Sequence, residues 1–166
     1  MISLIIMIIS LILDGILSNF LPYNDLSLFT PLLTIVSIFL IYPFYKKKET
    51  NYFITIAILG IIYDLFYTNL LFFNAALFLI IGYITKIIYK NLEISVIKLI
   101  IYLITIITIY ELATAAIIFI FNLVPITMTK VIYKITHSLL LNIIYGEVVY
   151  IILKILPKKY KKMNIN

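Results

Sequence analysis

The sequence predicts an all-α, polytopic membrane protein in which six transmembrane helices form a single domain, residues 1–166. Its composition is 64% hydrophobic and only 12% charged, with a mean hydropathy of +1.19. Soluble domains are roughly a quarter charged. The apolar residues form six long stretches, and most charges lie in the short gaps between them. So much apolar surface requires lipid as well as protein around it.

A helix needs about 20 mainly apolar residues to cross a bilayer. The first expected span is residues 2–21, which Pro22 closes. It has no basic residues before it and no small-residue cleavage site, so we expect a retained helix and not a signal peptide. The second is residues 29–45, with Pro31 in its first turn, where proline is tolerated. Lys46–Lys48 ends it.

Residues 52–89 contain no cluster of charges. As one helix this stretch would be about 57 Å long, roughly twice the hydrocarbon thickness. It must therefore form two spans, 52–68 and 72–89, with a reversal between Thr68 and Asn74. The fifth and sixth spans are expected at 97–121 and 131–156, separated by a turn that contains Pro125.

The lysines predict the orientation, because cytoplasmic loops of membrane proteins carry an excess of basic residues. With both termini in the cytoplasm, 11 lysines lie inside and two lie outside. The two outer ones are Lys130 and Lys134, and the inner ones are Lys46, Lys47, Lys48, Lys86, Lys90, Lys98, Lys154, Lys158, Lys159, Lys161 and Lys162.

Composition also limits the chemistry. The chain has no cysteine and one histidine, so it has neither disulfides nor a site of several histidines for a metal. We expect no cofactor. The net charge of +6 does not indicate nucleic-acid binding, because the lysines flank apolar spans, where their partners are the anionic head groups of membrane lipids.

Ionisable residues inside a membrane are costly and need an explanation. At 1.5 Å per residue, Asp14, Asp64, Glu111 and His137 all fall in the outer half of the membrane. Glu147 lies deeper, on a different face of its helix from His137. This layer is consistent with helix packing or contact with interfacial water, with binding of a partner, or with a ligand or proton site. No nucleophile, base and orienting acid converge, so we expect no enzyme activity.

Small and polar residues recur at helical spacing, which favours close helix packing. One such set lies in the third span: Ala57, Gly60, Asp64 and Thr68. A second, residues 111–116, places small residues beside Glu111. The sixth span carries a polar stripe: Lys130, Lys134, His137, Ser138, Asn142 and Tyr145.

The segment Gly60–Leu71, with Tyr63-Asp64 followed by Tyr67-Thr68, resembles the signature of the MreD family of rod-shape-determining membrane proteins. Gly82-Tyr83, Tyr110-Glu111 and Leu156-Pro157 fall where that family has similar residues. The resemblance covers nearly the whole chain. One departure is at Phe72-Phe73-Asn74, where a glycine often follows the turn in relatives.

The resemblance implies a non-enzymatic scaffold of the elongation machinery that builds peptidoglycan and maintains cell shape. The implied partners are a single-span MreC-like protein, a RodA-like glycosyltransferase and a class B penicillin-binding protein, and the implied location is the bacterial cytoplasmic (inner) membrane. The implied fold is similar to the substrate-binding components of energy-coupling-factor transporters, so a vitamin-uptake subunit is the alternative. Such subunits usually carry Ala-x-x-x-Ala in their first span, which here has no alanine.

Overall fold

The structure, a computed structural model, describes residues 2–20, 30–68, 70–90, 95–122, 125 and 127–155. These form α-helices α1 (Ile2–Phe20), α2 (Leu33–Ile41), α3 (Glu49–Tyr67), α4 (Phe73–Lys90), α5 (Val96–Ile120) and α6 (Met128–Ile155), with the 3₁₀ helix η1 (Tyr42–Tyr45) after α2. All the regular secondary structure in the described part of the chain is therefore helical, as the composition predicted.

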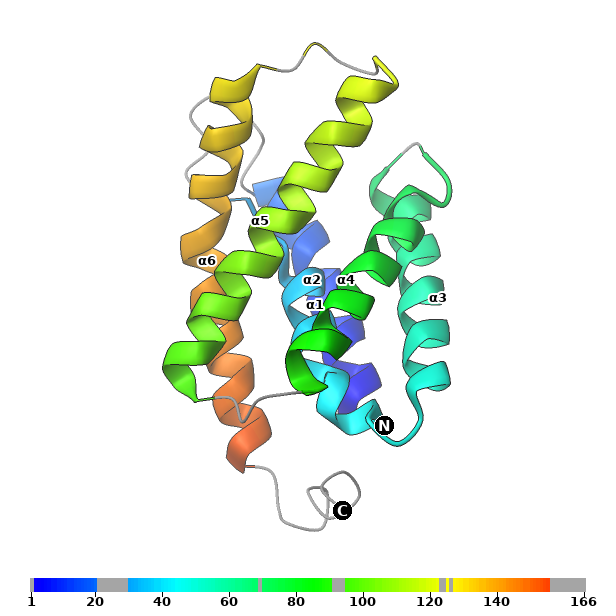
Figure 1. Ribbon diagram of the computed structural model, residues 1–166, viewed down its shortest axis with the longest axis vertical. Coiled ribbons are helices and arrows are strands. Elements are labelled where there is room, and N and C mark those ends of the chain that lie inside the picture. Colours follow the sequence, from blue (N-terminus) through cyan, green and yellow to red (C-terminus); the bar gives the residue numbers. More distant parts are fainter. Residues whose placement is uncertain are drawn as a thin grey trace.

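Five of these helices, α1 and α3 to α6, are long and apolar enough to cross a membrane. Successive helices run in opposite directions, and α5 and α6 extend beyond α3 and α4 at the upper end in Figure 1. The start of α1 and the last described turn of α6 both lie at the lower end of the bundle in Figure 1. Large apolar side chains cover the outward faces of α1, among them Ile5, Ile8, Ile12 and Ile16.

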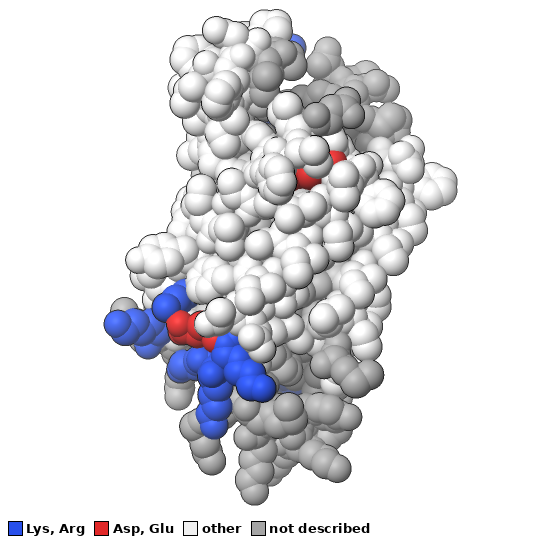
Figure 2. Space-filling model, turned by 90° about the vertical axis from the view of Figure 1, so that its right-hand side faces the viewer, with Lys and Arg blue, Asp and Glu red and all other residues white. Residues whose placement is uncertain are grey.

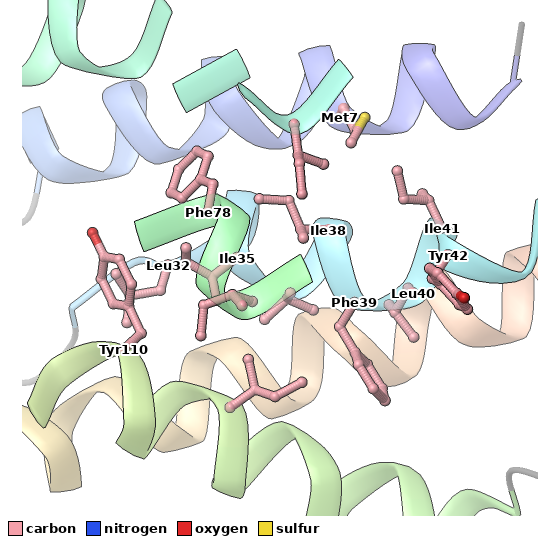
Figure 3. Packing of buried hydrophobic residues seen from close by; sticks show 14 of the residues in the cluster. Met7, Leu32, Ile35, Ile38, Phe39, Leu40, Ile41, Tyr42, Phe78 and Tyr110 are labelled. Carbon is pink, nitrogen blue, oxygen red and sulfur yellow. The ribbon is translucent and has the colours of Figure 1, made fainter. Parts of the chain in front are cut away.

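Helix α2 differs from the other five because all its residues, Leu33–Ile41, are buried. It packs against α1, α4, α5 and α6. Its nine residues reach only about 14 Å, half of a hydrocarbon core of about 30 Å. Figure 3 shows Ile35, Ile38 and Phe39 of α2 at the centre of the apolar core. The apolar core thus forms around a short helix, α2, that contributes no residue to the surface of the bundle.

The start of α2 corrects the expected second span. A helix from residue 29 with Pro31 in its first turn is wrong, since the helix begins at Leu33 and Thr30, Pro31 and Leu32 precede it without helical structure. Non-helical backbone at membrane depth is tolerated where protein surrounds it. Pro31 and Leu32 are buried, which meets this condition.

The bounds of the other helices differ less from those expected from the sequence. Helix α3 begins at Glu49 and α6 at Met128, each three residues before the expected start. The expected reversal between the third and fourth spans lies between Tyr67 and Phe73. Phe72 has a φ of 67°, a left-handed conformation that favours glycine. The turn thus keeps the conformation that a glycine would adopt, at a cost of about 1–2 kcal/mol for a side chain there.

Candidate functional site

Asp14 of α1 binds the N-terminus of α2. Its carboxylate is buried and accepts the backbone N–H of Leu33 at 2.7 Å and that of Thr34 at 2.8 Å. The first N–H groups of a helix have no partner within it, and Leu32, the residue before α2, provides no side-chain cap. A carboxylate also favours this end of the helix dipole. Asp14 therefore allows α2 to begin inside the bundle.

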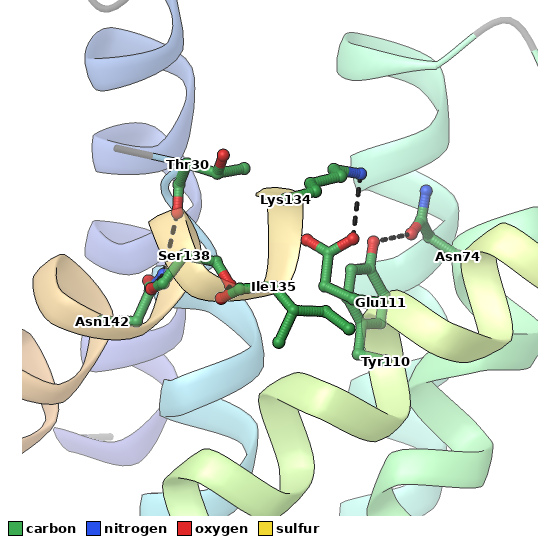
Figure 4. A network of polar contacts seen from close by, with 8 residues as sticks. All are labelled: Thr30, Asn74, Tyr110, Glu111, Lys134, Ile135, Ser138 and Asn142. Carbon is green, nitrogen blue, oxygen red and sulfur yellow. Dashed lines mark hydrogen bonds and ion pairs between the residues drawn. The ribbon is translucent and has the colours of Figure 1, made fainter. Parts of the chain in front are cut away.

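Asn142 of α6 completes the same helix start. Its Oδ1 accepts the N–H of Leu32 at 2.7 Å, and its Nδ2 donates to the carbonyl of Thr30 at 2.8 Å (Figure 4). The N–H of Thr30 donates to the carbonyl of His137 at 3.3 Å. The non-helical residues before α2 are thus bonded by α6, which explains why an amide lies fully buried in the middle of that helix.

Asp64 of α3 binds the N-terminus of α4, as Asp14 binds the N-terminus of α2. Its carboxylate accepts the N–H groups of Asn74 and Ala75, at 3.0 and 3.3 Å, in the first turn of α4. It also accepts the side-chain amide of Asn74 at 2.8 Å and the hydroxyl of Thr68 at 2.9 Å. Tyr110 of α5 donates its hydroxyl to Asn74 at 2.7 Å (Figure 4). One carboxylate thus organises α3, α4 and α5.

Gly60 lies one turn before Asp64 and allows α3 to approach α4. A Cβ at Gly60 would meet the Cα of Ala75, and it would lie 2.7 Å from the nitrogen of Ala75. Because both atoms are backbone, neither can move without moving α4. The approach brings Asp64 within reach of the first N–H groups of α4.

Glu111 of α5 is bonded differently. Its Oε2 lies 3.0 Å from the ammonium of Lys134 on α6 (Figure 4). The side chain of Glu111 is 1% exposed and that of Lys134 is 31% exposed. Its Oε1 is buried and has no hydrogen-bond partner in the described structure. The hydroxyl of Thr114, one turn further along α5, is also buried without a partner. Among the three buried acids of the described residues, only Glu111 has a carboxylate oxygen without a hydrogen-bond partner.

His137 and Glu147 do not join these contacts. The Nδ1 of His137 lies 2.8 Å from the carbonyl of Tyr133, and its ring stacks on that of Tyr133 at 3.7 Å. Only its backbone carbonyl meets the start of α2. Glu147 is half-buried, and none of the described residues forms an ion pair with it. Asp14, Asp64 and Glu111 therefore differ from these two residues.

Sequence reasoning did not identify which groups the acids bind. Lys134 and Asn142 were only members of a polar stripe, and Asn74 was only part of a turn. Ser10 of α1 was not paired with any residue, although its hydroxyl lies 2.6 Å from that of Tyr145 on α6. Lys134 is counted above with the outer lysines, but it is the fourth residue of the expected sixth span, so it falls in the outer half of the membrane like Glu111, and this depth is a signal for their pairing.

The arrangement holds helices together. Two of the three buried carboxylates bind backbone N–H groups, and the third binds a lysine. Among the described residues, no group of three or more His, Asp or Glu side chains could hold a metal ion. Fixed contacts of this kind are typical of a structural polar layer.

The fold and this layer define a class: an all-helical protein whose long apolar helices suggest a multi-pass membrane protein. The chain matches no protein-family model, no curated protein and no solved structure.

Proposed function

We propose that this chain is an MreD-like, non-enzymatic scaffold of the bacterial cell-wall elongation machinery. It would hold an MreC-like protein and peptidoglycan synthases of the RodA and class B penicillin-binding types in the cytoplasmic membrane, with both of its termini inside. The observation that carries the proposal is the segment Gly60–Leu71, whose order of residues resembles the MreD signature.

The local structure gives a physical reason for that order of residues. The glycine permits close approach to α4, the aspartate binds the start of α4, and Thr68 bonds the same carboxylate. Signature residues with this role would maintain the packing of α3 against α4 and would not take part in a reaction. It is therefore compatible with a protein that acts by presenting helix surfaces to partners.

The alternative is a substrate-binding subunit of a vitamin transporter. Such subunits dock through small residues of the first span. In α1, however, Ser10 meets Tyr145, Asp14 meets α2, and Gly15 lies against the ring of Tyr67. These residues face the chain's own helices, which favours the scaffold.

Purification of the tagged chain from its native membrane, followed by mass spectrometry, separates the two functions. The scaffold predicts cell-wall synthases and a single-span MreC-like protein among the retained proteins. Retention of a pair of ATPases with a coupling subunit, together with tight binding of a vitamin by the purified chain, would replace the scaffold with the transporter.

Bulky substitutions at exposed alanines locate the partner surface. Ala113 packs against the core and is unsuitable, whereas Ala116 of α5 is exposed. Ala116→Phe should release a partner without loss of the protein if α5 carries the interface. Ala76→Phe, at an exposed alanine of α4, is the matched control. If phenylalanine substitutions on all the outer helix faces leave the partners bound, the scaffold is contradicted.

Orientation has its own test, because the chain has no native cysteine. A cysteine at Lys47 should resist impermeant thiol reagents in intact cells, and one at Asn24, which lies outside the described residues, should react. The opposite pattern would place both termini outside.

A further inference from the structure

Lysines gather at the lower end of the bundle in Figure 2. Lys46, Lys47 and Lys48 are exposed and connect η1 to α3, and Lys90 is exposed at the end of α4. We call these four residues the lysine patch.

The described carboxylate that is nearest in the chain to Lys46–Lys48 pairs with a lysine outside the patch. Glu49 follows Lys48 in the chain, but its Oε2 lies 2.6 Å from the ammonium of Lys86 on α4. Its Oε1 accepts the hydroxyl of Tyr42 at 3.0 Å. Within the described residues, the four patch lysines form no ion pair.

The ion pair between Lys86 and Glu49 indicates that the four patch lysines lie close together. Lys86 and Lys90 are four residues apart, so they project from the same side of α4. Since Lys86 reaches Glu49, this side of α4 faces the start of α3 and the turn that contains Lys46–Lys48. Four positive charges from two parts of the chain therefore lie at one place on the surface.

An apolar surface adjoins the patch. Ile87 lies between Lys86 and Lys90 in the sequence and is 51% exposed, and Tyr83, one turn earlier, is 59% exposed. On α3, Ile54 is 54% exposed within two turns of Lys48. The surface therefore presents cationic groups beside an apolar helix face, which complements a molecule with an anionic head and an apolar tail.

We propose that the lysine patch binds anionic phospholipids, with the phosphate on the ammonium groups and the acyl chains along the exposed residues of α3 and α4. The exposed apolar side chains beside the patch favour a lipid over an acidic protein segment, because such a segment would bind the lysines and would leave the apolar side chains without a partner. Juxtamembrane lysines each increase affinity for an anionic membrane about fivefold. This inference does not depend on the scaffold function.

The test is native mass spectrometry of the full chain in a neutral detergent, titrated with dioleoyl phosphatidylglycerol or dioleoyl phosphatidylcholine. Phosphatidylglycerol should bind at least about tenfold more tightly. Lys90→Gln should weaken its binding about fivefold, and Lys46→Gln/Lys47→Gln/Lys48→Gln should weaken it more. Lys130→Gln, at an exposed lysine of the opposite end, is the matched control and should weaken the binding less than Lys90→Gln does.

Glu49→Gln gives the sharper test, because it breaks the ion pair with Lys86 and adds one uncompensated charge beside the patch. Binding of phosphatidylglycerol should then become tighter, whereas a merely structural role for Glu49 predicts no gain. Equal binding of the two lipids, or an equal loss with Lys130→Gln and Lys90→Gln, overturns the proposal. Displacement of the lipid by millimolar inorganic phosphate or by polyglutamate also overturns it, in favour of a free-phosphate or an acidic-protein site.

Discussion

Asp64 and Glu111 are both buried acids on the first helix of a helical hairpin, yet they bind different groups. Asp64 accepts two backbone N–H groups of α4, one side-chain amide and one hydroxyl. Among the described residues, Glu111 has one partner, the ammonium of Lys134, and its Oε1 has no donor. Asp14 resembles Asp64, since both of its oxygens accept backbone N–H groups.

The difference follows from where the second helix of each hairpin begins. Helix α3 ends at Tyr67 and α4 begins at Phe73, so the first turn of α4 returns to the level of Asp64. Helix α5 continues from Glu111 to Ile120 before α6 begins at Met128. Glu111 therefore meets the side of α6, where the backbone N–H groups are bonded within the helix, and its carboxylate pairs with the long side chain of Lys134.

This comparison separates two uses of an acid inside a membrane protein. At a helix start, the carboxylate replaces water for N–H groups that have no other acceptor in lipid. Against the side of a helix, it holds one cation and keeps capacity for a further donor. Substitutions at these positions should differ in cost accordingly.

The largest effect is expected for Asp64→Leu. It leaves two N–H groups and the amide of Asn74 buried without an acceptor, and each such group costs about 1–3 kcal/mol. We expect a loss of about 3–5 kcal/mol, well above the average of about 0.6 kcal/mol for a side-chain hydrogen bond between membrane helices. Thermal unfolding in one detergent measures it. Asp64→Asn keeps one acceptor oxygen and should cost less, and an unchanged Asp64→Leu variant would show that the cap is unimportant.

Gly60→Ala should come next. The new Cβ would meet backbone atoms of Ala75, so α3 and α4 must separate, at a cost of about 1–3 kcal/mol. Gly15→Ala is the matched control, because the atoms nearest to its Cβ belong to the side chain of Tyr67, whose displacement breaks one hydrogen bond, to the carbonyl of Leu11, and moves no helix backbone. Equal unfolding temperatures for these two variants would contradict the close backbone approach.

The double variant Glu111→Leu/Lys134→Met should have a small effect, within about 1 kcal/mol of the wild type. Replacing a buried ion pair with apolar residues is often neutral, whereas removing one partner is costly. Lys134→Met alone should therefore be less stable than the double variant, because it leaves the Glu111 carboxylate without its cation. A double variant as unstable as Asp64→Leu would show that Glu111 contributes as much to stability as Asp64 does, and would contradict the comparison.

The smallest effect is expected for Glu147→Gln. The side chain is half-buried and pairs with no described lysine, so the unfolding free energy should change by less than about 0.5 kcal/mol. A loss similar to that of Gly60→Ala would assign Glu147 a partner beyond the described residues.

The helical class and most of the helix positions could be predicted from the sequence, because a long apolar run has few ways to satisfy its backbone in lipid. The reversal near Thr68 followed from length alone, since residues 52–89 cannot form one crossing. The small-residue pattern also indicated which side of α3 packs closely. Local composition was sufficient for these conclusions.

The start of α2 and the partners of the acids depended on the tertiary structure. The apolar run that contains α2 is compatible both with a full helix and with a short helix preceded by buried non-helical residues. The choice depends on Asp14 and Asn142, which lie 19 and 110 residues from the N–H groups they bind. Likewise, the sequence shows Asp64 and Glu111 only as two acidic residues within apolar helices and does not distinguish their roles. Only the level at which the next helix begins makes one a helix cap and the other the partner of a lysine, because hydrogen bonds require positions in space that the order of residues does not specify.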